Sequence, residues 1–541
     1  MTEKELAIQN IKELVRRKGI FYALIMILVQ DSQMRVSQMK EIDFSERISC
    51  DEVFWLMGYL IQENSSFIYD YPNNLNQLLL KSEIHNALKK LQYSYLQPFF
   101  DNGIESIHSN ESIVSTLQES IHYDGDSAYD YEYADFAIMR YKYVSGWLKE
   151  NKSLDIVELS NLVKHLEQFL LEKTDIPYFF NQSEKKHFWG HNPSVEEENH
   201  LRMIQYAHLM SKDIFSKNQK QQEIATIEFC KKLLSLLTFS KNDFVSFSCI
   251  DAFIKNFTFD ITINNTLELK FDEPGRFNIL DAKPIIKIDD DCYFVPYLLK
   301  VFKAIYETPY YWLISDNKYS KTASRLIGKA HEEMVSNLLR NVYGHENTYT
   351  GIKIRTGKGK ESSEIDTLCI LNNKVLCVQV KSKRLTEKSK LGDYSSLISD
   401  FDKSVNNAYE QGITCKKAIL SKEFSFVDKD NNPISLPIRN TDEVYIMCIV
   451  CGEYEGLATQ SKRLFKEKAC CDLPLICSIF DLHLITTYLN NPYDFTYYVR
   501  KRVENWKYFA FTNEIAPLGF HLKNNLHRLE DQQFEIIDIS C

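Results

Sequence analysis

The sequence predicts a multidomain protein with a mostly α-helical N-terminal half and an α/β core nearer the C-terminus. Apolar residues recur at three- and four-residue spacing through the first 240 positions, which is the periodicity of helices packed on one face. Strand-like runs begin at about residue 244, and helical and strand-like segments alternate after residue 320. A chain of 541 residues has room for several domains of ordinary size.

Four regions are expected, namely a helical domain (1–240), a small α+β connecting region (241–319), the α/β core (320–425), and a C-terminal extension with one strand and helices that pack on the core (426–541). The helical patterns of the first region are clearest over 5–29, 51–63, 82–100 and 155–173. The strand-like runs of the connecting region are 259–263, 284–288 and 292–295, and the last two are joined by three aspartates as a hairpin would be.

A second hairpin is predicted inside the core. Residues 364–371 and 374–382 are strand-like, and only Asn372 and Asn373 separate them. Because asparagine tolerates positive φ, we expect a two-residue type I′ turn. Residues 371 and 374 then face each other, and paired positions sum to 745 along the hairpin.

This register brings polar side chains together. Asp366 falls opposite Gln379, and Glu364 falls opposite Lys381. Opposed Cβ atoms lie roughly 4.5–5.5 Å apart, and side chains two apart on a strand share a face. We therefore expect Glu364, Asp366, Gln379 and Lys381 to converge, offering hard oxygen ligands beside a cation, a combination that suits Mg²⁺-assisted hydrolysis of a phosphodiester.

A long helix is predicted before the hairpin. Glu332 lies on the flank of its apolar stripe, and Gly328 lies one turn earlier on the same flank. A glycine inside a helix costs about 1 kcal/mol relative to alanine, so we expect the helix to approach the hairpin or a phosphate closely there. The stripe comprises Leu326, Ile327, Ala330, Met334, Val335, Leu338, Leu339 and Val342.

Further elements complete the order of the core as helix, strand, hairpin, helix and strand. A strand is expected at 348–354, before the hairpin. After the hairpin, Asp393 is expected to cap a helix over 394–411 that Gly412 ends, and 416–420 to return as a strand. The polar stripe of this second helix comprises Lys403, Asn407 and Gln411.

Charge and cysteine content narrow the protein class. The formal charge of −10 argues against a protein that coats nucleic acid with its whole surface. Residues 353–390 nevertheless carry ten Lys or Arg against four Asp or Glu, a net of +6, which indicates either a phosphate-binding patch or a solvated loop. The thirteen cysteines lack framework spacing, which favours a reducing compartment.

We expect a cytoplasmic protein without a membrane partner. The apolar stretch at 19–29 is too short to span a bilayer and lacks a signal-peptide cleavage site. Cys448 and Cys451 have zinc-knuckle spacing, but residues three apart on a strand face opposite sides, so a zinc site is not expected. His331 and His345 are expected to be core or solvated residues rather than ligands.

Residues 324–420 resemble the PD-(D/E)XK nuclease superfamily, and the Gln-x-Lys variant resembles its Mrr-like restriction-endonuclease branch. The flanking regions resemble those of bacterial proteins of similar size. In family terms, Glu332 fits the first-helix glutamate of the pattern Gly-x-x-x-Glu-x-x-Val, and Asp366 fits the central metal-binding aspartate. Gln379-Val380-Lys381 fits the (Glu/Asp/Gln)-x-Lys element, in which Lys381 is the catalytic lysine.

The resemblance implies a Mg²⁺- or Mn²⁺-dependent endonuclease that hydrolyses DNA phosphodiesters. Lys381 would orient the attacking water and stabilise the transition state, and Glu332 would hold a water or a second ion. Gln379 is neutral where glutamate is commoner, so metal affinity should drop unless Glu364 compensates. The metal-binding atoms implied are the side chains of Asp366, Gln379, Glu332 and Glu364 and the main-chain carbonyl of Val380.

Contacts to substrate phosphates are assigned to Lys358, Lys360, Lys383, Arg384, Lys403 and Gln411. Two other functions stay open: a nucleic-acid-binding or scaffolding protein that kept the fold without catalysis, and an RNA nuclease. The helical half is expected to sense, regulate, or form a homo-oligomer or partner interface, as in anti-phage defence or restriction. No Walker A sequence is present, so the chain is not expected to power translocation.

Overall fold

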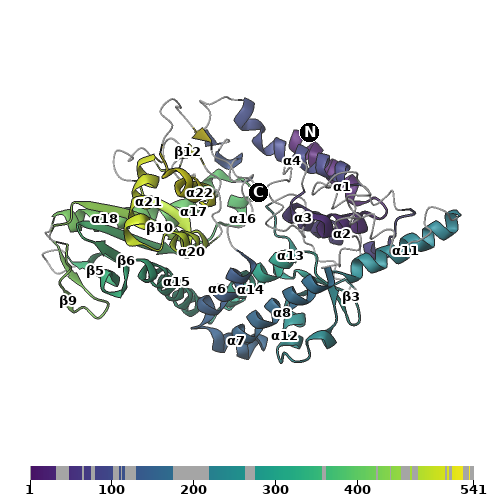
Figure 1. Ribbon diagram of the computed structural model, residues 1–541, viewed down its shortest axis with the longest axis horizontal. Coiled ribbons are helices and arrows are strands. Elements are labelled where there is room, and N and C mark those ends of the chain that lie inside the picture. Colours follow the sequence, from purple (N-terminus) through teal and green to yellow (C-terminus); the bar gives the residue numbers. More distant parts are fainter. Residues whose placement is uncertain are drawn as a thin grey trace, which may run out of the picture. The chain divides into compact units, whose positions relative to one another are not determined.

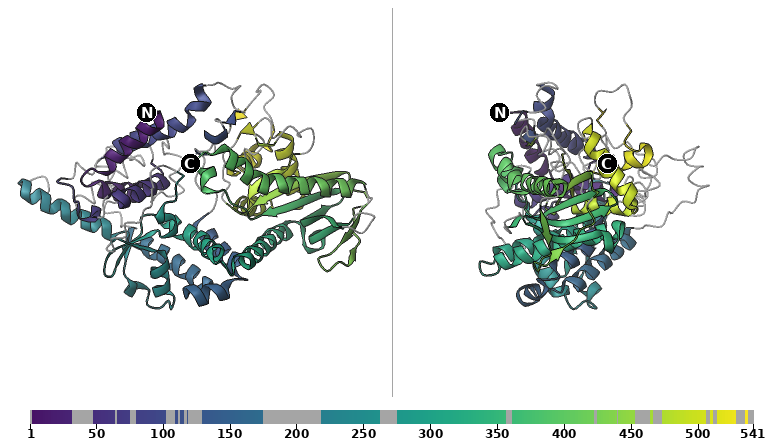
Figure 2. Two further views of the ribbon diagram at one scale, coloured as in Figure 1. Left: turned by 180° about the vertical axis from the view of Figure 1, so that it is seen from behind. Right: turned by 90° about the vertical axis from the view of Figure 1, so that its left-hand side faces the viewer.

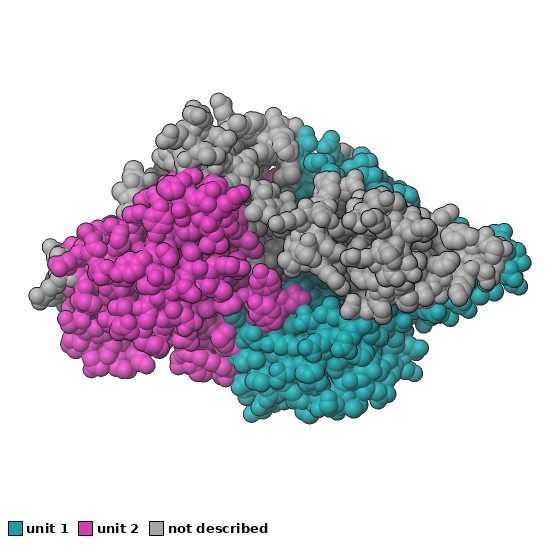
Figure 3. All heavy atoms as spheres, viewed as in Figure 1, with its two compact units in different colours: residues 1–97, 133–138, 145–311 teal, residues 98–132, 139–144, 312–541 magenta. Residues whose placement is uncertain are grey.

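The computed structural model describes residues 2–31, 48–63, 66–74, 80–101, 109–110, 113–115, 118, 129–174, 218–261, 275–355, 361–421, 424–438, 440–452, 464–465, 473–505, 509–510, 514–527 and 535–536 (Figures 1 and 2). The contacts divide the chain into two compact units (Figure 3). Unit 1 comprises residues 1–97, 133–138 and 145–311, and unit 2 comprises residues 98–132, 139–144 and 312–541.

Unit 1 is largely helical, as the apolar periodicity predicts. Its helices are α1 (Glu3–Val15), α2 (Ile20–Asp31), α3 (Cys50–Glu63), α4 (Lys81–Asp101), α7 (Ser145–Lys152), α8 (Ile156–Thr174), α11 (Gln219–Ser235), α12 (Ile250–Phe257), α13 (Ile279–Ala282) and α14 (Leu298–Ser315), with 3-10 turns η3 (Phe67–Tyr69) and η7 (Lys241–Phe244). The last residues of α4 and α14 are assigned to unit 2, and α6 (Asp130–Tyr141) contributes to both units.

The helical pattern at 5–29 forms two helices rather than one. The break falls at Gly19, whose φ of +79° is left-handed. A Cβ at this position would lie 2.7 Å from the Cβ of Pro72, so both the backbone conformation and the packing require glycine. The sequence pattern misses this break because the apolar spacing continues across it.

Unit 1 also contains a four-stranded sheet in the order β1-β4-β3-β2, whose strands are β1 (Thr238–Phe239), β4 (Cys292–Phe294), β3 (Ile285–Asp289) and β2 (Thr258–Asp260). The predicted hairpin of the connecting region is present as β3 and β4, in which Ile286 pairs with Phe294. The run expected at 259–263 is a strand only as far as Asp260, Ile261 lies in a turn, and 262–263 lie outside the described residues.

Unit 2 is built on a seven-stranded mixed sheet in the order β11-β10-β7-β6-β5-β8-β9, drawn in green and yellow in Figures 1 and 2. The described strands are β5 (Thr348–Arg355), β6 (Glu361–Leu371), β7 (Lys374–Lys381), β8 (Ser425–Val427), β9 (Pro433–Ile434), β10 (Glu443–Val450) and β11 (Leu475–Ser478). β10 is parallel to β7 and to β11, and the other neighbours are antiparallel. The predicted mixed sheet with an antiparallel hairpin is confirmed.

The strand predicted near residue 444 is β10, and it completes the core sheet. It lies beside β7, whose residues 375–380 are all buried, as expected for a central strand covered on both faces. A second strand, β11, pairs with the far side of β10. Sequence beyond residue 425 is therefore part of the sheet that carries the predicted site.

Helices cover both faces of this sheet (Figure 1). α15 packs against β5, β6 and β7, and α18 packs against β6, β7 and β10. The helices of unit 2 are α15 (Ser320–Tyr343), α16 (Glu387–Lys390), α17 (Tyr394–Phe401), the π-helical segment η9 (Asp402–Asn406), α18 (Asn407–Ser421), α20 (Ile479–Tyr488), α21 (Pro492–Asn505) and α22 (Ile515–Asn524), with the 3-10 turn η8 (His345–Asn347). A two-stranded sheet pairs β12 (Phe509–Ala510) with β13 (Glu535–Ile536).

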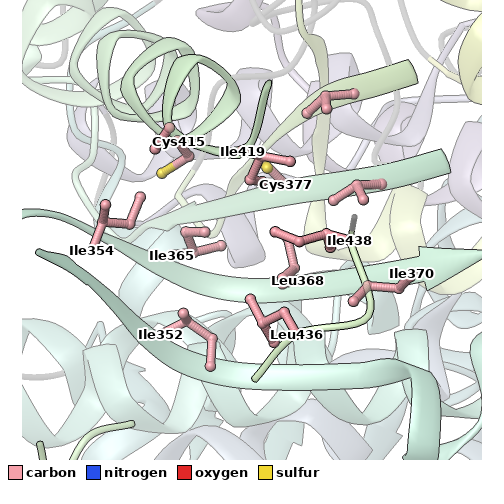
Figure 4. Close-up of a cluster of buried hydrophobic side chains, with 13 residues drawn as sticks. Ile352, Ile354, Ile365, Leu368, Ile370, Cys377, Cys415, Ile419, Leu436 and Ile438 are labelled. Atoms are coloured by element: carbon pink, nitrogen blue, oxygen red, sulfur yellow. The ribbon is translucent and has the colours of Figure 1, made fainter. Parts of the chain in front are cut away.

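The helix after the hairpin is longer than predicted. Asp393 caps it as expected, since its carboxylate accepts the Ser396 N–H at 2.7 Å. However, α17, η9 and α18 run without interruption to Ser421, so the strand expected at 416–420 is wrong. That short apolar run packs as a helical face instead, with Cys415, Ala418 and Ile419 in a buried cluster on the sheet (Figure 4).

Gly412 lies inside α18 and does not end the helix. A Cβ at Gly412 would lie 2.4 Å from Cγ2 of Ile446 on β10. The missing side chain therefore allows the helix to approach the sheet closely. A glycine in a helical pattern has two explanations, a C-terminal cap or a close contact, and only the packing on β10 distinguishes them.

Candidate active site

The register of the β6–β7 hairpin is the predicted one. Leu371 pairs with Lys374, and Thr367 pairs with Val378, so each pair sums to 745. The turn differs in detail from the prediction. Asn372 has a φ of +53°, whereas Asn373 does not have a positive φ. A type I′ turn requires positive φ at both central residues. One left-handed asparagine is thus enough to set the register.

The regular ladder ends where the candidate site begins. Pairing stops at Thr367 and Val378. Two residues further along β7, the Val380 N–H donates to Oδ2 of Asp366 at 2.7 Å. A carboxylate thus replaces the main-chain acceptor that continued pairing would supply, and Asp366 is fixed at the open end of the hairpin. In a strand the N–H and C=O of one residue point toward the same neighbour, so the Val380 carbonyl also faces this side.

The alternation of side chains breaks at Asp366. Leu368 and Ile365 are three residues apart, yet both belong to the buried cluster beneath α18 (Figure 4). Their partners on β5, Tyr349 and Ile352, pack on the same cluster. Gly351 stands between those partners with φ of +61°, and the pairing of β5 with β6 skips it. A phase change in both strands accounts for this pattern.

The phase change corrects the predicted convergence. Ser363 lies on the α18 side, with its Oγ 3.8 Å from Sγ of Cys415. Glu364, between Ser363 and Ile365, therefore turns its carboxylate to the opposite side and does not share a face with Gln379. What meets the Gln379 side chain is the main-chain carbonyl of Glu364, which accepts from Nε2 at 2.8 Å.

Gln379 is almost fully buried, with 1 % of its surface exposed. Its amide nitrogen donates to the Glu364 carbonyl and contacts Sγ of Cys415 at 3.8 Å. Because Nε2 is committed to these acceptors, Oε1 is the ligand atom that the amide can offer. A neutral amide suits this buried position, since a carboxylate would face a carbonyl oxygen without a proton between them.

Lys381 follows on the same strand and is held by the helix opposite. Its Nζ donates to Oε1 of Gln411 on α18 at 2.6 Å. The structure places Gln411 against the lysine, and its expected contact with substrate stays a prediction. The π-helical segment η9 lies in the helix one turn before Gln411, and such bulges shift the phase of a helix and occur often at functional sites. No sequence pattern indicates that shift.

Glu332 lies on the outer flank of α15, as predicted, with an exposed side chain. The protein atoms around its carboxyl, followed by the negative charges of Asp366 and Glu364, nevertheless raise its pKa to about 7, against a smaller opposing effect of Lys381. Burial and then Glu364 likewise raise the pKa of Asp366, although the Val380 N–H and Lys381 oppose the rise. The structure thus brings Glu332, Glu364, Asp366 and Lys381 within electrostatic range.

This carboxylate group fits a divalent cation through its charge. Like charges close together favour protonation, and a bound cation would remove that repulsion. No group of three or more His, Cys, Asp or Glu in the described part of the chain has its ligand atoms already gathered around one point. A metal would therefore rely on Asp366 together with neutral oxygens, which Gln379 and the Val380 carbonyl supply.

Gly328 does not bring α15 close to the hairpin. A Cβ built on this residue would meet nothing within 4 Å, so the packing explanation for the glycine is wrong. The space beside Gly328, one turn before Glu332 on this flank of α15, is open. Approach of a ligand is the explanation that remains from the sequence analysis.

The loop after β7 is anchored by a buried acid that the sequence analysis missed. Asp400 is 3 % exposed and accepts from the Thr386 N–H at 2.6 Å and the Ser389 hydroxyl at 2.7 Å. Lys383 Nζ lies 3.0 Å from its other oxygen. Burial raises the pKa of Asp400, but these hydrogen bonds lower it below its ordinary value overall. The sequence contains one indication of this role, because Asp400 is an acid on the apolar stripe of α17, three residues after Leu397.

The residues expected to contact phosphates are scattered. Lys383 is paired with Asp400, and Arg384 is buried, with 8 % of its surface exposed. Lys403 is exposed on η9, and Lys358 and Lys360 lie outside the described residues. Lys374, at the far end of β7, binds Glu443 at 2.8 Å. Among the described basic residues of 353–390, Lys374 and Lys383 are therefore in ion pairs and Arg384 is buried, so these three do not form one exposed patch.

Both histidines near the site behave as predicted. His331 is fully buried, its Nδ1 lies 2.7 Å from Oγ of Ser382, and burial lowers its pKa well below the ordinary value. His345 is exposed in η8. Neither histidine is placed to bind a metal ion together with the carboxylates of Glu332, Glu364 and Asp366.

Comparison with known families gives one result, and it falls on this segment. Residues 327–448 match the NERD family, described as a nuclease-related domain. This part of the chain is a nuclease-related domain of PD-(D/E)XK type. The match begins in α15, before Glu332, and ends in β10, so it contains the whole candidate site and the parallel strand beside it. No curated protein and no solved structure matches the chain.

No described helix combines the length and apolar character that a membrane span needs. The cysteines in the described ranges are free thiols.

Proposed function

We propose that the nuclease-related domain hydrolyses phosphodiester bonds of DNA with the help of Mg²⁺ or Mn²⁺. The observation that carries the proposal is the set of carboxylates at the open end of the β6–β7 hairpin beside Lys381. Burial, and then the negative charges of Asp366 and Glu364, raise the pKa of Glu332 to about 7, and the charge repulsion within this group is what a bound cation would relieve. Bound there, the metal would lower the pKa of water and neutralise charge on phosphorus oxygens.

The residues of the chain have separate tasks in this mechanism. Asp366, the Gln379 amide oxygen and the Val380 carbonyl would hold the ion. Lys381, oriented by its hydrogen bond to Gln411, would donate to a phosphoryl oxygen and stabilise negative charge in the transition state. Glu332 would accept a proton or a hydrogen bond from the attacking water, the task of a carboxylate general base that lies within reach of that water.

The test is cleavage by the full-length protein of supercoiled plasmid, linear duplex, single-stranded DNA and matched RNA, each with Mg²⁺, Mn²⁺ or EDTA. We expect metal-dependent cleavage that EDTA abolishes and Asp366→Ala removes. RNA cut faster than matched DNA would change the substrate and keep the reaction. The assignment is wrong if Asp366→Ala and Lys381→Ala both cleave as fast as wild type.

A second candidate is a nucleic-acid-binding or scaffolding protein with a weak or inactive nuclease fold. The neutral, buried Gln379 motivates it, because the amide adds no charge to hold a cation. It predicts salt-sensitive binding of nucleic acid without metal-dependent turnover, and no heat of Mn²⁺ binding in titration calorimetry. The same substrate panel therefore separates the two candidates.

We further propose that the helical N-terminal region controls the domain, as a sensor or an interface, in anti-phage defence or restriction. The helical region is longer than the nuclease-related domain at residues 327–448, and this difference in length supports a controlling role. Two measurements test it: the plating efficiency of phages on cells that express wild type or Asp366→Ala, and the mass in solution of the full-length chain by light scattering. Equal plating on both would contradict the defence role.

A further inference from the structure

The first half of α15 carries a line of cations that leads to Glu332. Lys321 and Arg325 are one turn apart and both are exposed. Gly328 and Glu332 continue the same flank, since residues three or four apart lie above one another on a helix. The line spans about 16 Å from Lys321 to Glu332 at 1.5 Å per residue.

Helix stability does not explain these cations. The first turn of α15 contains no acid, and the nearest acid before it, Asp316, accepts the N–H groups of Lys318 and Tyr319. The N-terminus of a helix is the positive end of its dipole, so acidic residues would stabilise it and basic residues oppose it. Cations retained there strengthen the positive potential at the start of α15.

The two leading cations also have no acid to neutralise them. Neither Lys321 nor Arg325 makes an ion pair within the described ranges of the chain, and both side chains reach solvent. Lys329 differs, because it lies 3.9 Å from Glu333 and 4.5 Å from the centre of the Tyr143 ring. Lys321 and Arg325 therefore carry the charge that a polyanion would meet first.

Gly328 gives an independent observation on the same line. It lies in the interior of a long helix, where glycine is unfavourable, and a Cβ on it would meet nothing within 4 Å. Gly412 shows what a packing glycine looks like in this domain, since a Cβ there would strike Ile446. No contact within the described residues explains the bare backbone at Gly328, one turn before Glu332.

We propose that this flank of α15 is the track along which the phosphodiester backbone of the cut strand approaches the site. Lys321 and Arg325 would bind its phosphates, and Gly328 would leave room for the chain to pass close to Glu332. The inference rests on the proposed function for its ligand, and it replaces Lys383 and Arg384 as the main phosphate contacts.

The first test measures binding without cleavage, in the full-length chain carrying Asp366→Ala. Labelled duplex DNA, single-stranded DNA and RNA of matched sequence are titrated by fluorescence anisotropy at several salt concentrations. We expect Lys321→Gln/Arg325→Gln to raise the Kd roughly tenfold and to reduce the salt slope by up to about 1.8 on duplex. The matched control Lys417→Gln/Lys523→Gln, two exposed lysines elsewhere in unit 2, should leave both unchanged.

The second test separates binding from folding. Gly328→Leu fills the open flank with a better helix former, so it should raise the Tm while weakening binding. Gly519→Leu is the matched control, because Gly519 is an exposed helix glycine of α22 whose Cβ also meets nothing within 4 Å. It should raise the Tm and leave the Kd unchanged. The inference is overturned if Lys321→Gln/Arg325→Gln and Gly328→Leu both bind with the Kd and the salt slope of the Asp366→Ala chain from which they are made.

Cleavage, measured separately in chains that retain Asp366, distinguishes this failure from failure of the proposed function. Hydrolysis by wild type, with unaltered binding in Lys321→Gln/Arg325→Gln, would overturn the track alone. Weakened binding in that variant, without hydrolysis by wild type, would support the track and overturn the nuclease activity. The three labelled substrates also show whether the strand that follows the track is DNA or RNA.

Discussion

The two ends of the β6–β7 hairpin differ in the hydrogen-bond partners of their main-chain groups. At the turn end, residues 367–371 pair with 374–378 in one uninterrupted register. At the open end, the Asp366 carboxylate takes the Val380 N–H, and the alternation of side chains changes phase. The regular end buries apolar side chains and keeps an uninterrupted ladder between β6 and β7. The open end lacks this regular pairing, and polar side chains lie together there, as expected of functional sites.

The two lysines of β7 show the same contrast. Lys374, at the turn end, binds Glu443 at 2.8 Å and is half-buried, so its charge is neutralised locally. Lys381, at the open end, donates to the neutral Gln411 and lies in the field of Glu332 and Asp366. Residue type and strand are the same, and only the surroundings differ. Each of the following experiments changes one end of the hairpin and uses the other end, or another part of unit 2, as the reference.

The largest effect is expected for removal of the lysine at the open end. Lys381→Ala should slow metal-dependent cleavage at least about 100-fold, the loss typical when one group that stabilises transition-state charge is removed. Lys374→Ala should leave the rate within about twofold, because Lys374 only forms a surface ion pair. Initial cleavage rates at saturating substrate measure both. Equal losses in the two variants would show that the ends do not differ in function.

Restoring the commoner acid tests why the open end carries an amide. Gln379→Glu removes the donor to the Glu364 carbonyl and buries a charge, so in EDTA the free energy of unfolding should fall by roughly 1–3 kcal/mol. Mg²⁺ should stabilise this variant more than wild type, because the added carboxylate is a stronger ligand. Urea unfolding with EDTA and with Mg²⁺ measures both changes. An equal response to Mg²⁺ in the two proteins would remove Gln379 from the metal site.

A smaller effect is expected from pH in the metal-free protein. The pKa of Glu332 rises from an ordinary 4.5 to about 7 on folding, so the folded state favours the protonated form. The penalty is absent below the unfolded pKa, and stability is lost as pH rises from about 4.5 to about 7. In EDTA, Glu332→Gln should therefore have a flatter Tm between pH 5 and pH 8 than wild type. Glu410→Gln, an exposed glutamate of α18, should retain the wild-type slope.

The smallest effect is expected at the turn. Asn372→Ala places a side chain with little tolerance for left-handed backbone at φ of +53°, which costs about 1–2 kcal/mol. Asn372→Gly should cost less, since glycine adopts that conformation freely. Neither variant should alter the cleavage rate per folded molecule, because the turn is the end of the hairpin remote from Lys381. Chemical denaturation and the cleavage assay are run on the same samples.

Sequence reasoning succeeded where local chemistry decides structure. Two adjacent asparagines between apolar runs identified the turn and therefore the register. The apolar stripe of α15 placed Glu332 on an outer flank, and the acid at 393 marked a helix start. Each of these features depends on residues within a few positions of one another, so a single sequence contains the information.

It failed where distant contacts decide. The run at 416–420 has the composition of a strand or of a buried helix, and packing on the sheet chooses the helix. Glu364 was placed on the wrong face because Gly351, on a different strand, changes the phase. The ion pair of Lys383 with Asp400 and the burial of Arg384 likewise come from tertiary packing, which the basic stretch by itself does not show.

The sequence by itself determined the register of the hairpin, the order of its acidic and basic residues, and the nuclease-like character of the segment. The tertiary structure decided which of those residues meet. It turned Glu364 away from Gln379, set Gln411 against Lys381, and left Lys321 and Arg325 exposed beside an open glycine. The physical reason is that turn and helix preferences act over a few residues, whereas burial and charge neutralisation depend on partners far away in the chain.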